Sequence, residues 1–246
     1  MNVKLKLQYD GTNYHGWQIQ NNGITVQQVI MDALKSVTGE TTNVIGCGRT
    51  DAGVHALNYI CNFHTESSVP VDKFPYALNS HLPDDIRVLE AQAVSEEFHA
   101  KNSAVKKRYI YRVLNTDIND AFLGKYAWHC RFPLDIDAMR HAAKAFLGEH
   151  DFIGFASSGF TVKTTVRTIY SLDVLKDGNV ITIDVTGNGF LYNMVRIIAG
   201  TLVFAGSGKI DYHDMADIIS SKCRDRAGIT APANGLFLKE VYYGRD

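Results

Sequence analysis

The spacing of apolar and polar residues predicts alternating strands and helices in the first hundred residues. Strict alternation marks the strands, and apolar positions three or four residues apart mark the helices. The predicted elements, in chain order, are strand 3–9, helix 26–37, strand 59–63, helix 73–80 and strand 87–94. Thr25 opens a capping box with Gln28, and Gly39 follows the last apolar residue, so the helix 26–37 also has its end signals. This half therefore reads β-α-β-α-β.

The second half mixes strands and helices in a different order. The predicted elements are strand 107–114, helix 135–147, strands 166–175 and 180–186, helices 190–205 and 212–222, and strand 236–242. Asp177–Gly178 between the two central strands is typical of a hairpin turn. With one helix set aside, the order β-α-β-β-α-β is that of a ferredoxin-like unit.

One long stretch, residues 149–165, has no clear periodicity. Loops of this length in compact domains are usually functional or disordered. The stretch contains Phe152, Phe155 and Phe160, which are unusual in a simple linker. We therefore expect a mobile loop that contacts substrate.

Composition narrows the class of protein. The chain has 246 residues, 46% of them hydrophobic, and a net charge of −1, so RNA binding would need local basic clusters. The start of the chain does not resemble a signal peptide, and its longest strongly apolar stretch, 197–205, is far shorter than the ~20 residues of a membrane span. The cysteines form no CxxC pair, and the histidines form no HxH or HExxH pattern. We expect a cytoplasmic protein without membrane anchor, disulfide framework or metal.

The segment from Gly46 to His55 places a carboxylate and a guanidinium on a turn with three glycines. It fails as a dinucleotide fingerprint because Asp51 stands where glycine is needed, and as a P-loop because Val54 stands where lysine is needed. Aspartate in such a loop is most often a turn former, and Arg49 nearby is most often a surface partner. An oriented carboxylate here is also what covalent catalysis by aspartate requires, with Arg49 favouring its ionised form.

The sequence GRTDAGVHA at 48–56 resembles the signature of the tRNA pseudouridine synthase I (TruA-type) family. The other matching segments, in the family's order, are YDGTNYHGWQ (9–18), LPDDI (82–86), FHA (98–100), KKRYIYRV (106–113), GFLYNMVR (189–196) and GLFL (235–238). The resemblance extends from Leu5 to Tyr242. It implies an α+β fold in which two ferredoxin-like-derived α/β halves, 1–100 and 101–246, pack around a central mixed, largely antiparallel sheet with the active-site cleft between them.

The resemblance also implies a reaction and the residues that perform it. Members of this family isomerise uridine to pseudouridine in the anticodon stem-loop of tRNA, at positions 38 to 40, as homodimers and without a cofactor. Asp51 matches the family's nucleophile, and Tyr109 matches its active-site tyrosine. Leu236 matches an apolar residue that walls the uracil pocket. The substrate-binding residues that we expect alongside it are Arg49, Lys101, Lys107 and Arg108.

Arg196 is the third catalytic candidate, and its position in the sequence indicates this role without the resemblance. It stands among apolar residues of a predicted helix, where arginine is rarely buried without a partner. Gly189, Asn193, Arg196 and Gly200 recur at helical spacing and form a narrow polar seam. The anion that Arg196 needs is either Asp51 or an ordinary structural partner elsewhere.

Two other functions compete with an isomerase. A non-catalytic RNA-binding or RNA-folding protein could have the same scaffold, but it would not need Asp51, Tyr109 and Arg196 together. An aspartyl-nucleophile hydrolase or phosphotransferase would normally carry an acidic metal-binding cluster such as DxD. The acidic pairs here, 84–85 and 96–97, lie elsewhere in the sequence.

Overall fold

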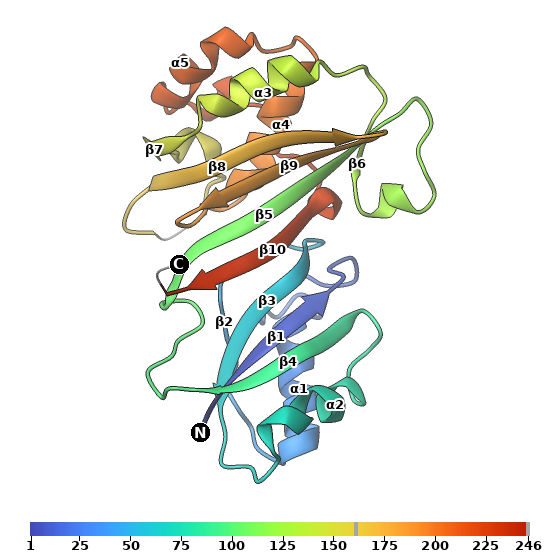
Figure 1. Cartoon of the computed structure of the whole chain (residues 1–246), viewed down its shortest axis with the longest axis vertical. Helices are drawn as coiled ribbons and strands as arrows, with labels where there is room; N and C mark the ends of the chain where they lie inside the picture. The colour runs from blue at the N-terminus through green and yellow to red at the C-terminus, as the bar shows by residue number, and fades with distance from the viewer. Residues whose placement is uncertain (160–161, 245–246) are drawn as a thin grey trace. The chain divides into compact units, whose positions relative to one another are not determined.

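The computed structural model describes residues 1–159 and 162–244. The Cα positions group the chain into two compact units, Met1–Val105 with Phe237–Asp246, and Lys106–Leu236. Both contain strands and helices (Figure 1), which confirms the predicted α+β class. In the described part of the chain, no helix has both the length and the apolar character needed to cross a membrane.

The first unit is built on a sheet with the strand order β4-β1-β3-β10. The bounds are β1 (Asn2–Tyr9), β3 (His55–His64), β4 (Ile86–Val94) and β10 (Leu236–Tyr243), with the short strand β2 (Ile45–Gly46) pairing β3. Strand β1 is antiparallel to β3 and to β4, whereas β10 runs parallel to β3 with Phe237 opposite His55. The last strand of the chain therefore completes the sheet that the first strand begins.

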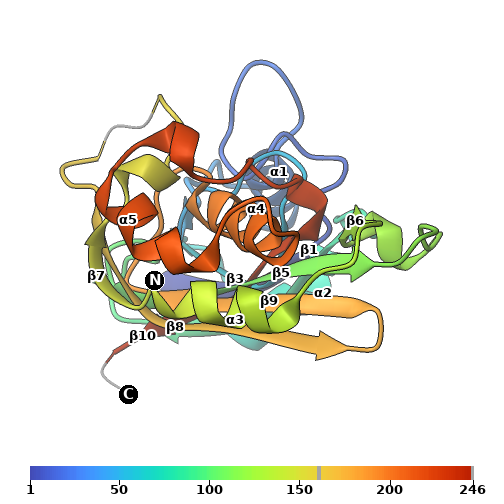
Figure 2. The same ribbon diagram turned by 90° about the horizontal axis from the view of Figure 1, so that it is seen from above.

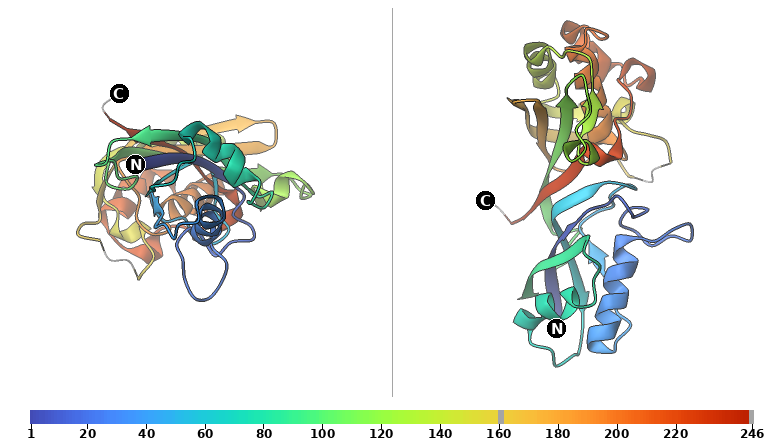
Figure 3. Two further views of the ribbon diagram at one scale, coloured as in Figure 1. Left: turned by 90° about the horizontal axis from the view of Figure 1, so that it is seen from below. Right: turned by 90° about the vertical axis from the view of Figure 1, so that its right-hand side faces the viewer.

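Two helices, α1 (Val26–Thr38) and α2 (Phe74–Asn79), belong to this unit. Figure 3 shows α1 running beside the strands, and α2 packs against β4 and α1. The Thr25 side chain accepts the Gln28 N–H at 3.4 Å, and Gly39 ends α1 in the left-handed region at φ 76°. The Thr25 cap and the glycine end signal are confirmed, whereas the Gln28 side chain bonds Asp32 and does not complete the predicted capping box.

The second unit has the strand order β5-β9-β8-β7, and β6 runs parallel to β5. The bounds are β5 (Ala104–Asn115), β6 (Trp128–Cys130), β7 (Gly148–Asp151), β8 (Val166–Asp177) and β9 (Val180–Gly187). Its helices are α3 (Ile136–Lys144), α4 (Met194–Gly206) and α5 (Met215–Ser220) (Figure 2). Gly178 has φ 54° between β8 and β9, which confirms the hairpin.

Short 3₁₀ turns join these elements. They are η1 (Val71–Lys73), η2 (Leu123–Lys125), η3 (Ile153–Phe155), η4 (Tyr212–Asp214), η5 (Arg224–Arg226) and η6 (Ala233–Gly235).

The structure corrects two predictions. The stretch from 149 does not begin as a loop: residues 149–151 belong to β7, paired with β8, and Phe152 and Phe155 are buried against Phe146. Their aromatic character reflects core packing, and Phe160 lies outside the described residues. The helix predicted from 190 begins at Met194, because Asn193 adopts the left-handed conformation at φ 61°.

Candidate functional site

Asp51 lies on a tight turn in the first unit, between β2 and β3. Its carbonyl accepts the Val54 N–H at 3.1 Å, and its side chain is half-buried. The preceding residue, Thr50, is buried, and its hydroxyl lies 2.9 Å from the Tyr9 hydroxyl. The turn is therefore fixed at its own peptide and through its neighbour.

The segment after β1 cradles this turn through backbone contacts. The Trp17 N–H donates to the Thr50 carbonyl at 3.1 Å, and the Gly53 N–H donates to the Tyr14 carbonyl at 3.3 Å. Gly16 allows the approach, because a Cβ there would lie 2.4 Å from the Thr50 carbonyl oxygen and its φ is +87°. Two segments that match the family, YDGTNYHGWQ and GRTDAGVHA, thus form one structure around Asp51.

Two stacked aromatic rings, Trp17 and Tyr59, support the Asp51 turn. Trp17 and Tyr59 stack with ring centroids 4.0 Å apart, and the Tyr59 hydroxyl donates to the Gly48 carbonyl. Burial raises the pKa of Tyr59 well above its ordinary value, so the hydroxyl keeps the proton that it donates. The packed rings and this part-buried hydrogen bond hold the turn in place.

His55, the last residue of the turn segment, anchors the turn to the sheet. It is buried and stacks on Phe237 at 4.6 Å between centroids. Its Nδ1 lies 3.0 Å from both the Gly11 nitrogen and Asp10 Oδ1. The histidine therefore joins β3, β10 and the end of β1 directly behind the turn.

Arg49 is exposed, and in the described part of the chain it makes no ion pair. One interpretation of the sequence was that Arg49 pairs with the Asp51 carboxylate. The guanidinium does not make this pair. Its exposure agrees with the other expected role, a contact with a bound polyanion.

In the second unit, Tyr109 and Tyr111 lie on β5 with different environments. The Tyr109 ring is half-buried and meets Phe190 edge-on at 5.3 Å between centroids. Tyr111 is fully buried, and its hydroxyl donates to the Pro232 carbonyl at 2.8 Å. Burial raises the pKa of Tyr111, and the charge of Arg196 acts in the opposite direction. Tyr111 is a core tyrosine.

Arg196 is half-buried in the first turn of α4 and not in mid-helix, because the helix begins at Met194. Its Nε–H donates to the Ala231 carbonyl at 2.7 Å, and its Nη1 donates to Asn193 Oδ1 at 2.8 Å. Its own carbonyl accepts the Ala231 N–H at 3.2 Å. The loop 228–232 therefore binds both Arg196 and Tyr111 through backbone groups.

These backbone acceptors were not visible in the sequence. A carbonyl group exists at every residue, so nothing in the letters Ala231 and Pro232 marks them. The predicted polar seam did point to Asn193, which lies on the same side of the helix start as Arg196. Leu236 begins β10 and is buried, with 6% of its surface exposed.

The expected basic contact residues differ in how they are held. Arg108 forms a two-pronged pair with Asp184, with both N···O distances 2.7 Å, so much of its charge is already balanced. Lys101 is exposed on a turn in which His99 Nδ1 accepts the N–H groups of residues 101 and 102, both at 3.2 Å. Lys107 is half-buried on β5.

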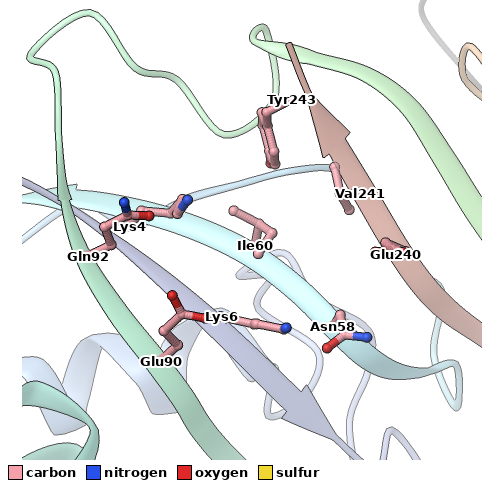
Figure 4. A pocket seen from close by; sticks show the side chains of 9 residues that line it. All are labelled: Lys4, Lys6, Asn58, Ile60, Glu90, Gln92, Glu240, Val241 and Tyr243. Atoms are coloured by element: carbon pink, nitrogen blue, oxygen red, sulfur yellow. The ribbon is translucent and has the colours of Figure 1, made fainter. Parts of the chain in front are cut away.

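A separate hollow of about 190 Å³ lies on the sheet of the first unit (Figure 4). Its walls carry Lys4 and Lys6 from β1, Glu90 and Gln92 from β4, and residues of β3 and β10. None of the predicted site residues lines it. Among the residues that the structure describes, no three His, Cys, Asp or Glu side chains gather in a way that could hold a metal ion.

Comparisons with known proteins show which family the sequence matches. The family model described as tRNA pseudouridine synthase matches residues 7–102 and 142–244. A protein named tRNA pseudouridine synthase A from Thermoanaerobacter sp. (strain X514) is 50% identical over 242 residues, covering 98% of this chain and 99% of that protein. Its namesake from Acetivibrio thermocellus is 51% identical over 242 residues, with the same coverage.

Solved structures give a weaker likeness. A crystal structure of the archaeal box H/ACA sRNP Nop10–Cbf5 complex is 12% identical with a TM-score of 0.37, covering 91% of this chain and 59% of that chain. A TM-score this low supports no conclusion about the fold or the function of this chain.

The family match and these relatives define the chain as an RNA-modifying isomerase. The chain is a member of the tRNA pseudouridine synthase family.

Proposed function

We propose that this enzyme converts uridine to pseudouridine in the anticodon stem-loop of tRNA, at positions 38 to 40, with Asp51 as the essential carboxylate. The observation that carries the mechanism is the half-buried Asp51 on a turn held by Thr50, Gly53 and Val54. A carboxylate on so fixed a turn loses little orientational freedom when substrate binds.

The reaction exchanges bonds within one nucleoside. The N1–C1′ bond breaks, the uracil turns, and a C5–C1′ bond forms, while a proton leaves C5 and one is taken up at N1. Asp51 attacks C1′ of the ribose or C6 of the ring, and either route returns the carboxylate unchanged. No electrons are transferred to or from the nucleoside, so the balance needs no redox cofactor.

Tyr109 and Arg196 complete the proposed catalytic group. Tyr109 stacks on the extruded base and accepts the C5 proton through its hydroxyl, which requires positive charge nearby because a phenol ordinarily has a pKa of about 10. Arg196 is the cationic partner of Asp51. Its support is that Ala231 and Asn193 hold the guanidinium in one direction.

Substrate binding must extrude a stacked uridine at a cost of a few kcal/mol. Contacts to the RNA backbone offset this cost and set the register. In this proposal Arg49 and Lys101, both exposed, and Lys107 contact phosphates, and Leu236 packs against the uracil. Arg108 contributes less, because Asp184 already pairs with it. The enzyme works as a cytoplasmic homodimer, which would assemble a basic cleft from nearly neutral chains.

The test uses tRNA transcript tritiated at uridine C5, purified protein and no added cofactor. Tritium release by the wild type and its loss in Asp51→Asn support the proposal, with Asp173→Asn, an exposed residue of β8, as the matched control. A chelator should leave the rate unchanged. Binding of tRNA without tritium release would favour the competing non-catalytic RNA-binding protein.

A further inference from the structure

Asn193 lies in the left-handed region, which asparagine tolerates better than most residues other than glycine. Among the described residues, only Asn193 (φ 61°) and Lys222 (φ 55°) are non-glycine residues in this region. Glycine fits it without steric cost, so the backbone alone does not require the amide. The asparagine also precedes α4, where its side chain could cap the helix, yet it makes no capping hydrogen bond. Its hydrogen bonds go elsewhere.

That side chain bridges two segments. Its Oδ1 accepts from Arg196 Nη1 at 2.8 Å, and its Nδ2 donates to Ser157 Oγ at 2.9 Å. The amide orientation is determined by its partner, because a guanidinium has only donors and the oxygen must face it. A second bond, from the Ser157 N–H to the Tyr192 carbonyl at 3.1 Å, fixes the serine beside it.

The Arg196 head is thus held from two directions. The Ala231 carbonyl binds Nε from the loop 228–232, and Asn193 binds Nη1 from the start of the helix. Two bonds to different atoms of a planar group fix both its direction and its rotation. With Asn193 removed, the guanidinium loses the bond that holds Nη1 from the start of the helix, and its plane is held less firmly.

We infer that Asn193 is a positioning residue, which sets the plane of the Arg196 guanidinium for the reaction. This inference rests on the proposed role of Arg196 in catalysis. Neither helix capping nor backbone conformation requires the amide, so its replacement by glycine should affect turnover and leave the fold intact.

The test is a double-mutant cycle with Asn193→Gly and Arg196→Met, measured as tritium release with enzyme in excess over tRNA. Asn193→Gly should lower the rate about tenfold to a hundredfold, the range expected for one hydrogen bond to a charged group. The loss of two side-chain hydrogen bonds should lower the Tm by only a few degrees, and tRNA affinity should change less than about twofold. In the Arg196→Met background, Asn193→Gly should cause no further loss, because it acts only through the arginine.

Lys222→Gly is the matched control, since it relieves the same backbone conformation and removes only a partly exposed pair with Asp151. Its rate should equal that of the wild type. A wild-type rate for Asn193→Gly, or an additive loss in the double variant, would overturn the inference.

A second readout does not depend on the reaction. In protein labelled with nitrogen-15 arginine, the Arg196 Nε–H resonance, assigned by its absence in Arg196→Met, should show lower order in Asn193→Gly. Unchanged order would refute the positioning role. If the wild type releases no tritium, the proposed function fails, and this measurement still decides whether Asn193 orients Arg196.

Discussion

Replacing Gly200 with alanine tests whether the loop 228–232 is seated by direct backbone contact with α4. Gly200 lies one helical turn after Arg196. A Cβ there would lie 1.9 Å from the Ile229 carbonyl oxygen, whereas ordinary contact begins at 3.4 Å, so the loop would have to retreat by about 1.5 Å. Three bonds depend on that seat: Gly228 N–H to Thr201 Oγ1 at 2.8 Å and the two between Ala231 and Arg196 at 2.7 and 3.2 Å.

The expected magnitude combines opposing effects. In an unconstrained helix, Gly→Ala stabilises by about 1 kcal/mol. Overpacking costs about 1–3 kcal/mol, and each weakened hydrogen bond costs about 1 kcal/mol more. The net loss for Gly200→Ala is therefore about 3–5 kcal/mol, or a Tm lower by about 6–20 °C for a chain of this size. Turnover should fall as well, because the Ala231 carbonyl moves away from Arg196.

Urea and thermal unfolding measure the effect, and Gly189→Ala is the control. A Cβ at Gly189 meets only the side chain of Arg167, at 3.6 Å, which is an ordinary van der Waals contact. The control should change stability by less than about 1 kcal/mol. If Gly200→Ala unfolds at the wild-type midpoint, direct backbone contact with α4 does not seat the loop.

Three further predictions concern other parts of the fold. Thr25→Ala removes the side-chain cap of α1 and should lower the unfolding free energy by about 1 kcal/mol, which a shift of the urea midpoint relative to Ser36→Ala would reveal. Asp184→Asn breaks the pair with Arg108, in which the Asp184 side chain is 8% exposed and the Arg108 side chain 34% exposed. The free energy of unfolding should fall by about 1–3 kcal/mol, and an unchanged urea midpoint would show that the pair contributes nothing. Hydrogen bonds from Thr165 and Lys222 lower the pKa of Asp151, so its contribution is present above the unfolded pKa of about 3.9 and is lost as the pH falls through the lower folded value. The stability gap between wild type and Asp151→Asn should therefore shrink in acid, and a gap that is constant with pH would contradict this.

Local patterns determined much of this protein's fold. The alternation in β1 and β3, the capped helix α1 and the hairpin at Gly178 were all predicted, because each depends on residues close together in the sequence. The motifs also pointed to the family, which the comparisons confirmed. The strands β2 and β6 were not predicted, because two and three residues are too few to show an alternating pattern.

Tertiary structure decided what depends on distant residues. Phe152 and Phe155 pack into the core because β7 pairs with β8, a contact invisible in a local window. Strand β10 pairs in parallel with β3, and this pairing joins residues far apart in the sequence, so no local pattern could predict it. The backbone carbonyl of Ala231 reaches Arg196 across 35 residues, and every residue carries such a group. Sequence points to the side chains proposed for the chemistry, whereas long-range packing selects the backbone atoms that orient them.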